Sequence, residues 1–530
     1  MVSKNSAFAG LHLDCRFTRE LPADPELSNQ PRQVHGSAYS WVAPTKVSEP
    51  KLLACNLELA QTLGFSATEV ESPLFSAVFS GNRALLGPDG ERSAYAVCYG
   101  GHQFGHWAGQ LGDGRALGLA EVIGLDGARY ELQLKGAGPT PYSRHADGRA
   151  VLRSSLREYL CSEAMHGLGV PTTRALSLIS SGDAVVRDMF YSGDPRAEPG
   201  AIVCRVAPSF IRFGNFELAA ARGDLVLLDQ WVAFTISRDF PHLTGAGDEL
   251  RVSWLVEVAE RTADLMVHWL RVGFVHGVMN TDNLSILGLT IDYGPYGWLD
   301  SFDPNWTPNT TDAEGRRYAY AKQPQVAYWN LNRLVAAIAP LMADKAALEV
   351  PLKAYVARFN HGYVQMLGAK LGILEPQPDD LTLSSELHEL LHSAEVDMTI
   401  FYRQLAMINC DAPLPEPLFD AFYSPDLLAK HAVTLNAWLE KYALRLRGQA
   451  EVSDTRVQRM QAINPRYVPR NYLAQQAIDA AERGDLRELH TLLTLFKRPY
   501  DEQPEFARYA LRRPDWARER AGCSSLSCSS

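Results

Sequence analysis

Two short runs near the middle of the chain constrain its fold and chemistry more than any other feature. Residues 276–283 read HGVMNTDN, and residues 291–294 read IDYG. The apolar positions in LSILG and LTIDYG predict a short hairpin beneath the first run. Asn283 and Asp292 offer oxygen ligands of the hard kind that magnesium takes when it also binds nucleotide phosphates.

The same runs resemble a kinase active site with one part displaced. Kinases place a catalytic acid two residues after the His, then an Asn, then the Asp of a D-[FY]-G turn. Here Val278 occupies the place of the acid, and Asp282 stands immediately before Asn283 as a candidate base for a hydroxyl nucleophile. Each residue alone could be an Asx turn, a helix cap or a turn residue, but the combination favours chemistry.

A lysine on a predicted strand is the next candidate. The run YELQLK at 130–135 alternates apolar and polar residues, so its polar set, which ends at Lys135, shares one face. We expect that face to look into a cleft, where the ammonium neutralises phosphate charge and Glu158 on the following helix holds it in place. A single strand lysine is more often a solvated surface group, so this pairing depends on the other motifs.

Glycines and arginines suggest an anion site. Gly112 and Gly114 in the run GDGR let backbone N–H groups approach an anion, and Arg115 adds a forked donor suited to phosphate. The run is neither a Walker loop nor a dinucleotide fingerprint, and alone it predicts a tight turn. Further arginines could each form a surface salt bridge, but together they favour a polyphosphate ligand. They are Arg144, Arg149, Arg153, Arg157, Arg205 and Arg212.

Composition narrows the class of protein. With 530 residues, 46% of them hydrophobic, the chain can form two or three globular domains. Its net charge of -10 argues against broad binding to nucleic acid or an anionic membrane. No window approaches the roughly 18 apolar residues of a membrane helix, and no secretory pattern opens the chain, so we expect a cytoplasmic protein. The 8 cysteines form no C-x-x-C pair, so neither a zinc site nor a disulfide scaffold is predicted.

The order of predicted elements indicates an α+β chain in four parts. Residues 1–94 form an N-terminal extension with one helical-looking piece, KLLACNLELAQTLGF. Residues 95–215 combine strands with one crossing helix into a nucleotide-binding lobe, and residues 216–370 form a helical catalytic lobe. Residues 371–530 form a mainly helical C-terminal region, whose Cys- and Ser-rich tail, GCSSLSCSS, is predicted to be flexible and exposed.

Four long runs carry a close resemblance to a known family. They are YGGHQFGHWAGQLGDGRA, LQLKGAGPTPYSRHADGRAVLRSSLREYL, HGVMNTDNLSILGLTIDYGPYGWLD and NPRYVPRNYLAQQAI. Together they span most of the chain, which resembles the selenoprotein O and YdiU family of protein adenylyltransferases, pseudokinases with a bilobal protein-kinase-like fold.

The resemblance implies transfer of AMP from ATP to Ser, Thr or Tyr hydroxyls of target proteins, with release of pyrophosphate, and the family suggests redox-related proteins as targets. The nucleotide would bind in the opposite sense to that of a kinase. Asp282 would accept the proton, Glu158 would pair with Lys135, and Asn283 and Asp292 would hold Mg²⁺ or Mn²⁺. The residues implied to bind ATP are Gly112, Gly114, Arg115, Lys135, Asp147, Gly148, Arg205, Arg212 and Asp292.

Three other readings stay open. The closest is a protein uridylyltransferase that uses UTP and Mn²⁺. An orthodox kinase is disfavoured by Val278, which stands where a kinase has its Asp. A non-catalytic ATP-binding pseudokinase is disfavoured by the retained set of Lys135, Glu158, Asn283 and Asp292, because a scaffold has no need of metal ligands.

One departure concerns cysteines. In relatives a Cys in a run like G-F-I-C-N follows the D-[FY]-G segment and is implied to pair with a Cys near the C-terminus. The corresponding run here is NWTPN at 305–309, so Pro308 stands where that thiol would be. The resemblance therefore implies no such disulfide in this chain, although a pair between Cys523 and Cys528 stays open.

Overall fold

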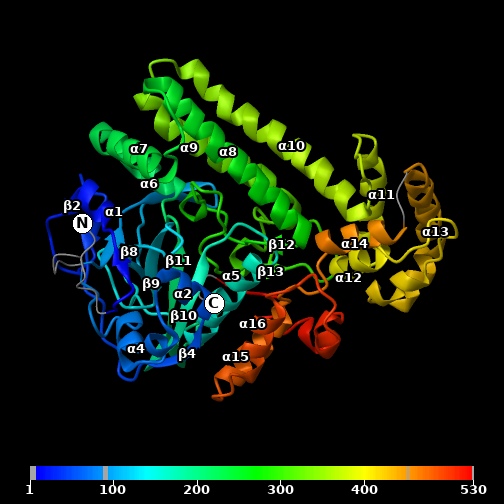
Figure 1. The fold of residues 1–530 in the computed structure, drawn as a ribbon, viewed down its shortest axis with the longest axis horizontal. Coiled ribbons are helices and arrows are strands. Elements are labelled where there is room, and N and C mark those ends of the chain that lie inside the picture. Colours follow the sequence, from blue (N-terminus) through cyan, green and yellow to red (C-terminus); the bar gives the residue numbers. More distant parts are fainter. Residues whose placement is uncertain (1–7, 87–92, 450–452, 528–530) are drawn as a thin grey trace.

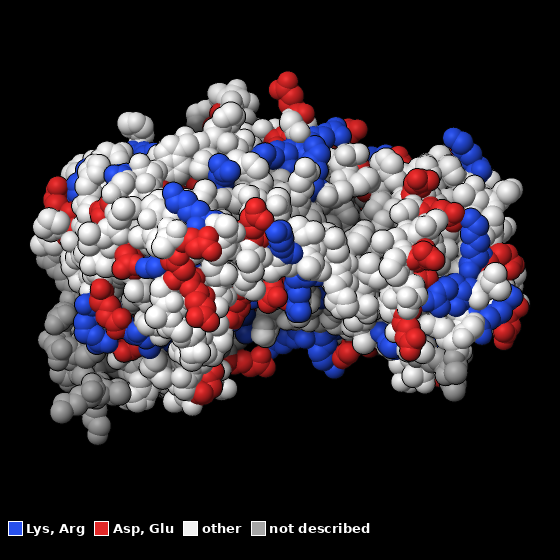
Figure 2. Space-filling view, turned by 90° about the horizontal axis from the view of Figure 1, so that it is seen from above, with Lys and Arg blue, Asp and Glu red and all other residues white. Residues whose placement is uncertain are grey.

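The computed structural model describes residues 8–86, 93–449 and 453–527 and has a mixed α+β architecture, which confirms the expected class. In Figure 1 a large sheet lies beneath a layer of long helices, and further helices extend the molecule at one end. The described part of the chain contains no helix that is long and apolar enough to cross a membrane. Figure 2 shows basic and acidic side chains interspersed over one face of the molecule.

The large sheet draws strands from both the first ninety residues and the segment that follows. Its order is β2-β3-β5-β8-β9-β11-β10-β4, with β1 paired to β8. All pairings are antiparallel except that of β2 with β3. The strands are β1 His12–Leu13, β2 Ala23–Asp24, β3 Tyr39–Trp41, β4 Lys51–Cys55, β5 Tyr95–Val97, β8 Ala116–Ile123, β9 Arg129–Lys135, β10 Arg174–Arg187 and β11 Arg196–Ala207.

Helices cover both faces of this sheet because β10 and β11 carry apolar side chains on both sides. Leu178 and Val203 pack with α5 (Leu152–Gly167), whereas Ile179 and Ile202 pack with the N-terminal helices. The strand predicted at 130–135 and the helix predicted to carry Glu158 are confirmed as β9 and α5, and β9 pairs with β8 in an antiparallel hairpin. The N-terminal helices are α1 Arg16–Glu20, α2 Leu57–Leu63, α3 Ala67–Val70 and α4 Pro73–Phe79.

One expected helix is in part a strand. The piece KLLACNLELAQTLGF begins as β4, which pairs with β10, and becomes helical only at α2, where the Asn56 side chain accepts a hydrogen bond from Leu59 N. Sheet pairing at Lys51–Cys55 thus overrides the apolar spacing that favoured a helix.

The expected hairpin at LSILG and LTIDYG is also absent from the structure. Ser285 forms its bridge with Arg212, and Thr290 forms its bridge with Thr172, so the two segments pair with other elements and not with each other. The D-Y-G turn is therefore anchored to the loop that precedes β10, and the segment that follows the HGVMNTDN run is anchored to the residue before α6 (Phe213–Ala221).

The remaining elements are mostly helical, as expected for the second half of the chain. Two further sheets have two strands each: β6 Gly100–Gln103 pairs with β7 His106–Gln110, and β12 Phe274–Val275 pairs with β13 Gly297–Trp298. The α-helices are α6 Phe213–Ala221, α7 Leu225–Asp239, α8 Gly247–Val272, α9 Gln323–Ile338, α10 Glu349–Leu371, α11 Asp380–Ser393, α12 Met398–Leu405, α13 Pro425–Arg447, α14 Ser453–Ile463, α15 Asn471–Ala481 and α16 Arg487–Leu495. Helices α7 to α10 form the upper layer of Figure 1.

The C-terminal tail is packed where it is described, which corrects the expectation of an exposed tail. Cys523 and Leu526 are 2% and 1% exposed. Leu526 N donates to Pro308 O at 2.8 Å, and Leu526 O accepts from Thr310 N at 2.8 Å. The segment at 308–310 thus lies against the tail through backbone pairing. Cys528 lies outside the described residues, so its pairing with Cys523 stays a prediction.

A buried arginine fastens the C-terminal region to the rest. The Arg470 guanidinium, 2% exposed, donates to Asp397 at 2.8 and 3.0 Å and to Asp300 at 3.0 Å. Asp300 ends the run at 276–300, and Asp397 caps α12.

Substitution Arg470→Leu should lower the free energy of unfolding by about 3–5 kcal/mol, because it leaves the buried Asp397 carboxylate without its counter-ion and Asp300 with only the longer, 3.5 Å contact to Arg513. Urea denaturation followed by circular dichroism measures the change. Arg487→Leu is the matched control, since Arg487 pairs with Asp485 at an exposed site and should matter little. Equal effects of the two substitutions would contradict a central role for Arg470.

Candidate active site

A cavity of about 490 Å³ opens between the large sheet and the catalytic loop at 276–283. It collects most of the residues that the sequence singled out, although they come from distant parts of the chain. Those that line it are Gly112, Gly114, Arg115, Lys135, Arg205, Asp282, Asn283 and Asp292.

Lys135 and Glu158 form the expected ion pair. Lys135 ends β9 between β8 and β11, and Glu158 approaches it from the middle of α5, with both side chains nearly fully buried. Glu158 also accepts from Arg205 on β11 at 3.2 Å. Burial lowers the pKa of Lys135, and Glu158 opposes that shift. Two cations thus depend on one carboxylate, which keeps the Lys135 ammonium facing the cavity.

Asp292 is held by two arginines. Its carboxylate accepts from Arg205 on one oxygen and from Arg212 on the other. Although burial alone would raise it, the guanidinium groups of Arg212 and Arg205 hold the pKa of Asp292 far below its ordinary value. Asp292 has a φ of 55°, a left-handed conformation that Asp tolerates better than most residues. The carboxylate is therefore fixed and ionised at neutral pH.

Arg212 lies behind the cavity and is not part of its lining. Its guanidinium, 2% exposed, also donates to Asp282 O at 2.8 Å and stacks on the Tyr99 ring at 4.5 Å. Arg212 therefore ties the catalytic loop to the D-Y-G turn and faces the cavity only through Asp292.

Asp282 lies in the short 3₁₀ turn Thr281–Asn283 and has an unusual carboxyl group. Its Oδ1 is buried with no hydrogen-bond partner among the described residues, and its Oδ2 accepts from Gln103 Nε2 at 3.4 Å. Burial raises the pKa of Asp282 to about 7, although the nearby Arg212 charge lowers it. A carboxyl with such a pKa and a free oxygen is suited to accept a proton near neutral pH.

The β6–β7 hairpin holds the catalytic loop, a role that sequence reasoning did not assign. His102 N donates to Thr281 Oγ1 at 2.7 Å, and Phe104 N donates to Asn280 Oδ1 at 3.2 Å. A Cβ on Gly101 would lie 2.6 Å from Asp282 Oδ1, so this position requires glycine. The signal in the sequence was the Gly100-Gly101 pair, because adjacent glycines mark a close approach of backbone to another group.

The loop residues around Asp282 have structural tasks. His276 Nε2 donates to Ile291 O at 2.8 Å, and the ring stacks on Trp269. Asn283 Nδ2 donates to Val278 O at 2.9 Å, so its amide oxygen is the atom left for a ligand. Val278, which occupies the sequence position of the kinase acid, lines the cavity, and Asp282 is the carboxyl on this loop.

Two arginines at the cavity are available for an anion. Arg115 and Arg144 line it, and among the described residues neither forms an ion pair with a carboxylate. Gly112 and Gly114 lie so close to Tyr142 that a Cβ would fall 2.5 Å and 2.9 Å from its atoms. The GDGR run therefore follows the cavity wall closely.

Other predicted residues lie outside the cavity. Asp147 pairs with Arg187 at 2.7 Å, and Gly148, with a φ of 67°, packs against Gly138. Arg153 pairs with Glu198, and Arg157 donates to Tyr296 O. Arg149 donates to the carbonyl groups of Thr45 and Lys46. The expected excess of arginines at the cleft is thus smaller than the sequence suggested.

The donor set fits a magnesium or manganese ion that is completed by phosphate. Among the described residues no three His, Cys, Asp or Glu side chains cluster into a metal site. Asn283 and Asp292 nevertheless share the cavity with the unpartnered Oδ1 of Asp282. Mg²⁺ commonly binds through one or two protein ligands plus substrate phosphates and water, so this set suffices.

The carboxyl group of Asp282 should titrate near pH 7 in the ligand-free protein, because burial disfavours its charged form. It is protonated below that pH and ionised above it. Carboxyl ¹³C signals of aspartate-labelled protein report the titration, and the signal lost in Asp282→Asn identifies the residue. A midpoint near 4 would contradict the burial of this carboxyl.

Comparison with known proteins adds a family. The family model for protein adenylyltransferase SelO matches residues 25–497. A protein nucleotidyltransferase YdiU from Xanthomonas campestris pv. campestris (strain 8004) is 60% identical over 524 residues, which cover 98% of this chain and 99% of the relative. The proteins of the same name from Azoarcus sp. (strain BH72) and Aromatoleum aromaticum are 59% and 58% identical, each over 98% of this chain and 99% of their own.

Proposed function

The chain belongs to the SelO family of protein adenylyltransferases, and we propose that it transfers AMP from ATP to a Ser, Thr or Tyr hydroxyl of a protein substrate. Its relatives are named protein nucleotidyltransferases, so it is an enzyme that transfers a nucleotidyl group. Redox-related proteins are the proposed targets, and the cytoplasm is the proposed location.

One observation carries this proposal. The carboxyl of Asp282, with an unpartnered Oδ1, shares a cavity with Lys135, Arg115 and Arg144. A base and a cluster of cations at one cavity suit the attack of a hydroxyl on a phosphate ester, where charge develops on phosphate oxygens.

The proposed reaction assigns each group a task. Asp282 takes the proton of the acceptor hydroxyl while the hydroxyl oxygen forms a bond to the α-phosphorus of ATP. The bond from the α-phosphorus to the bridging oxygen breaks, and pyrophosphate leaves with that electron pair. Lys135, Arg115 and Arg144 neutralise phosphate charge, and Glu158 keeps Lys135 oriented. Arg205 and Arg212 act by fixing Asp292. Asp147 and Gly148, on the loop beside the cavity, are proposed to contribute to ATP binding.

Asn283 and Asp292 are the proposed ligands of Mg²⁺ or Mn²⁺, which would supply charge neutralisation at the phosphates when bound. Asp292 suits this task because its two arginines keep it ionised. Its carboxylate would then share its oxygens between the arginines and the ion.

We also propose that the fold is the bilobal one of protein kinases, with the four parts 1–94, 95–215, 216–370 and 371–530. The sheet with α5 corresponds to the nucleotide-binding lobe, and α6 to α10 belong to the catalytic lobe. The position of the cavity between these parts supports the proposal. Strands β1 to β4 join the same sheet, so the first part would be an extension of that lobe.

Purified protein with magnesium, a candidate protein substrate and ATP labelled at either the α or the γ phosphate separates the candidate reactions. We expect label on protein from the α position only. Label from γ only would make the chain a kinase. In a parallel reaction with labelled UTP, transfer from UTP but not from ATP would make it a uridylyltransferase.

Asp282→Ala should abolish transfer while nucleotide binding stays measurable, since it removes the base but no phosphate contact.

Substitution Gly101→Ala should reduce transfer more than tenfold with a small effect on nucleotide affinity, because the added methyl group displaces the Asp282 carboxyl. The initial rate of α-label transfer and a nucleotide titration measure the two effects. Gly315→Ala is the matched control, since a Cβ there meets no atom within 4 Å. Unchanged transfer in Gly101→Ala would show that the hairpin does not position Asp282.

A further inference from the structure

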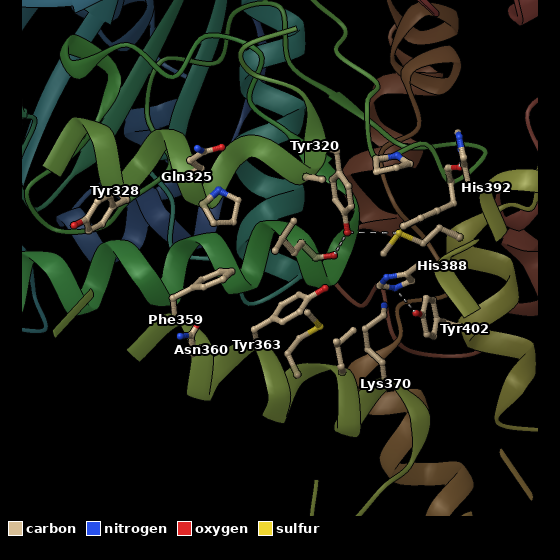
Figure 3. Close-up of a pocket in the computed structure, with 18 of the residues that line it drawn as sticks. Tyr320, Gln325, Tyr328, Phe359, Asn360, Tyr363, Lys370, His388, His392 and Tyr402 are labelled. Atoms are coloured by element: carbon tan, nitrogen blue, oxygen red, sulfur yellow. Dashed lines mark hydrogen bonds between the residues drawn. The ribbon is translucent and has the colours of Figure 1, made fainter. Parts of the chain in front are cut away.

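A second cavity, of about 640 Å³, lies among α9, α10, α11 and α12 (Figure 3). It shares no lining residue with the cavity of Asp282. Its volume falls in the range of sites that hold small molecules, roughly 300–1,000 Å³. The proposed transfer reaction uses none of its residues.

The walls of this cavity are largely aromatic. On α10, Tyr355, Phe359 and Tyr363 follow at a spacing of four residues, and their rings stack in sequence at 6.3 and 5.6 Å. Figure 3 shows Tyr320, from the segment before α9, on the side of the cavity opposite Tyr363, and the Tyr328 ring on α9 lies 5.8 Å from that of Tyr355. Such walls suit an apolar body, either a ring system or an acyl chain.

A buried lysine lies at one end of the cavity. Lys370, 3% exposed, donates from Nζ to Arg271 O at 2.8 Å, and its Nζ stands 4.1 Å from the centre of the Tyr402 ring. No carboxylate among the described residues pairs with it. Burial lowers the pKa of Lys370 well below its ordinary value, and Arg271 lowers it further. An ammonium group has three donors, so an anion could bind here and restore the charge.

The groups beside Lys370 add a polar contact without a second full charge. Burial, with the nearby Lys370, lowers the pKa of His388 to about 4, so its ring is neutral at pH 7. His388 Nε2 lies 3.1 Å from Tyr402 Oη, and Figure 3 shows both side chains converging with Lys370. Glu389, the one acid of the described lining, is exposed. One buried cation in an apolar cavity matches a singly charged anion better than a phosphate dianion.

We propose that this cavity is a second ligand site, and that it binds an amphipathic carboxylate whose head meets Lys370 and whose aromatic or aliphatic body lies along the rings of α10. The site is separate from nucleotide transfer and does not depend on the identity of the transferred group.

Isothermal titration of the full chain tests the site with two probes, 2-naphthylacetate for an aromatic body and decanoate for an aliphatic one. We expect at least one to bind with a Kd of about 1 mM or tighter, and its neutral analogue, 2-naphthylacetamide or decanol, to bind about tenfold more weakly. The better probe identifies the body that the cavity takes.

Two variants locate the binding. Lys370→Met should weaken the carboxylate about tenfold and leave the neutral analogue unchanged, because it removes the one Lys or Arg side chain of the cavity lining among the described residues. Lys353→Met is its control on the same helix, where the lysine is exposed and pairs with Glu349. If Lys370→Met does not fold, Val356→Glu tests the location of binding instead. Val356 is an exposed lining residue, so the glutamate places a negative charge at the cavity and should weaken the binding of the carboxylate probe about threefold or more.

Val350→Glu is the control for that second variant, since Val350 is equally exposed on α10 but does not line the cavity. Absence of carboxylate binding, equal affinity for the neutral analogues, or equal effects of variants and controls would each overturn the proposal.

Discussion

The candidate active site depends on the ion pairs that Arg205 and Arg212 form with Asp292. Arg205 belongs to the sheet, Arg212 immediately precedes α6, and Asp292 belongs to the D-Y-G turn, so three elements meet at one carboxylate. Breaking a buried pair of this kind leaves an uncompensated charge and costs about 3–5 kcal/mol. The same arginine, Arg212, holds the backbone of Asp282, which couples the proposed base to the proposed metal ligand.

This arrangement gives two carboxylates on neighbouring loops opposite properties. Asp292 faces two guanidinium groups and is ionised, whereas Asp282 has a pKa near neutrality and a buried oxygen that no described residue contacts by a hydrogen bond. Environments that push two pKa values apart are typical of sites where one group binds charge and the other moves a proton. The β6–β7 hairpin completes the site by closing over Asp282 with a residue that has no side chain.

Much of the site followed from local patterns. Alternation placed Lys135 on a strand face and helical spacing placed Glu158 on α5, and their pairing followed once the kinase-like motifs elsewhere in the chain were considered with them. The pairing of Ser285 with Arg212 and of Thr290 with Thr172 could not be predicted, since bridges to distant segments leave no local pattern. The arginines illustrate the same limit, because Arg153 and Arg157 look free in sequence but find buried partners in space.

The sequence by itself determined the α+β class, the family and the list of groups that could do chemistry, because these follow from periodicity and residue types in long motifs. Only the tertiary structure decided which of those groups meet. In the structure Asp147 forms an ion pair with Arg187, and Gln103 donates a hydrogen bond to Asp282. The described part of the tail packs against the segment at 308–310. The tertiary structure also assembled the cavity of Lys370 from helices α8 to α12 and the segment that precedes α9. Each of these contacts joins residues far apart in the chain, where burial and charge pairing act through space and not through neighbouring sequence.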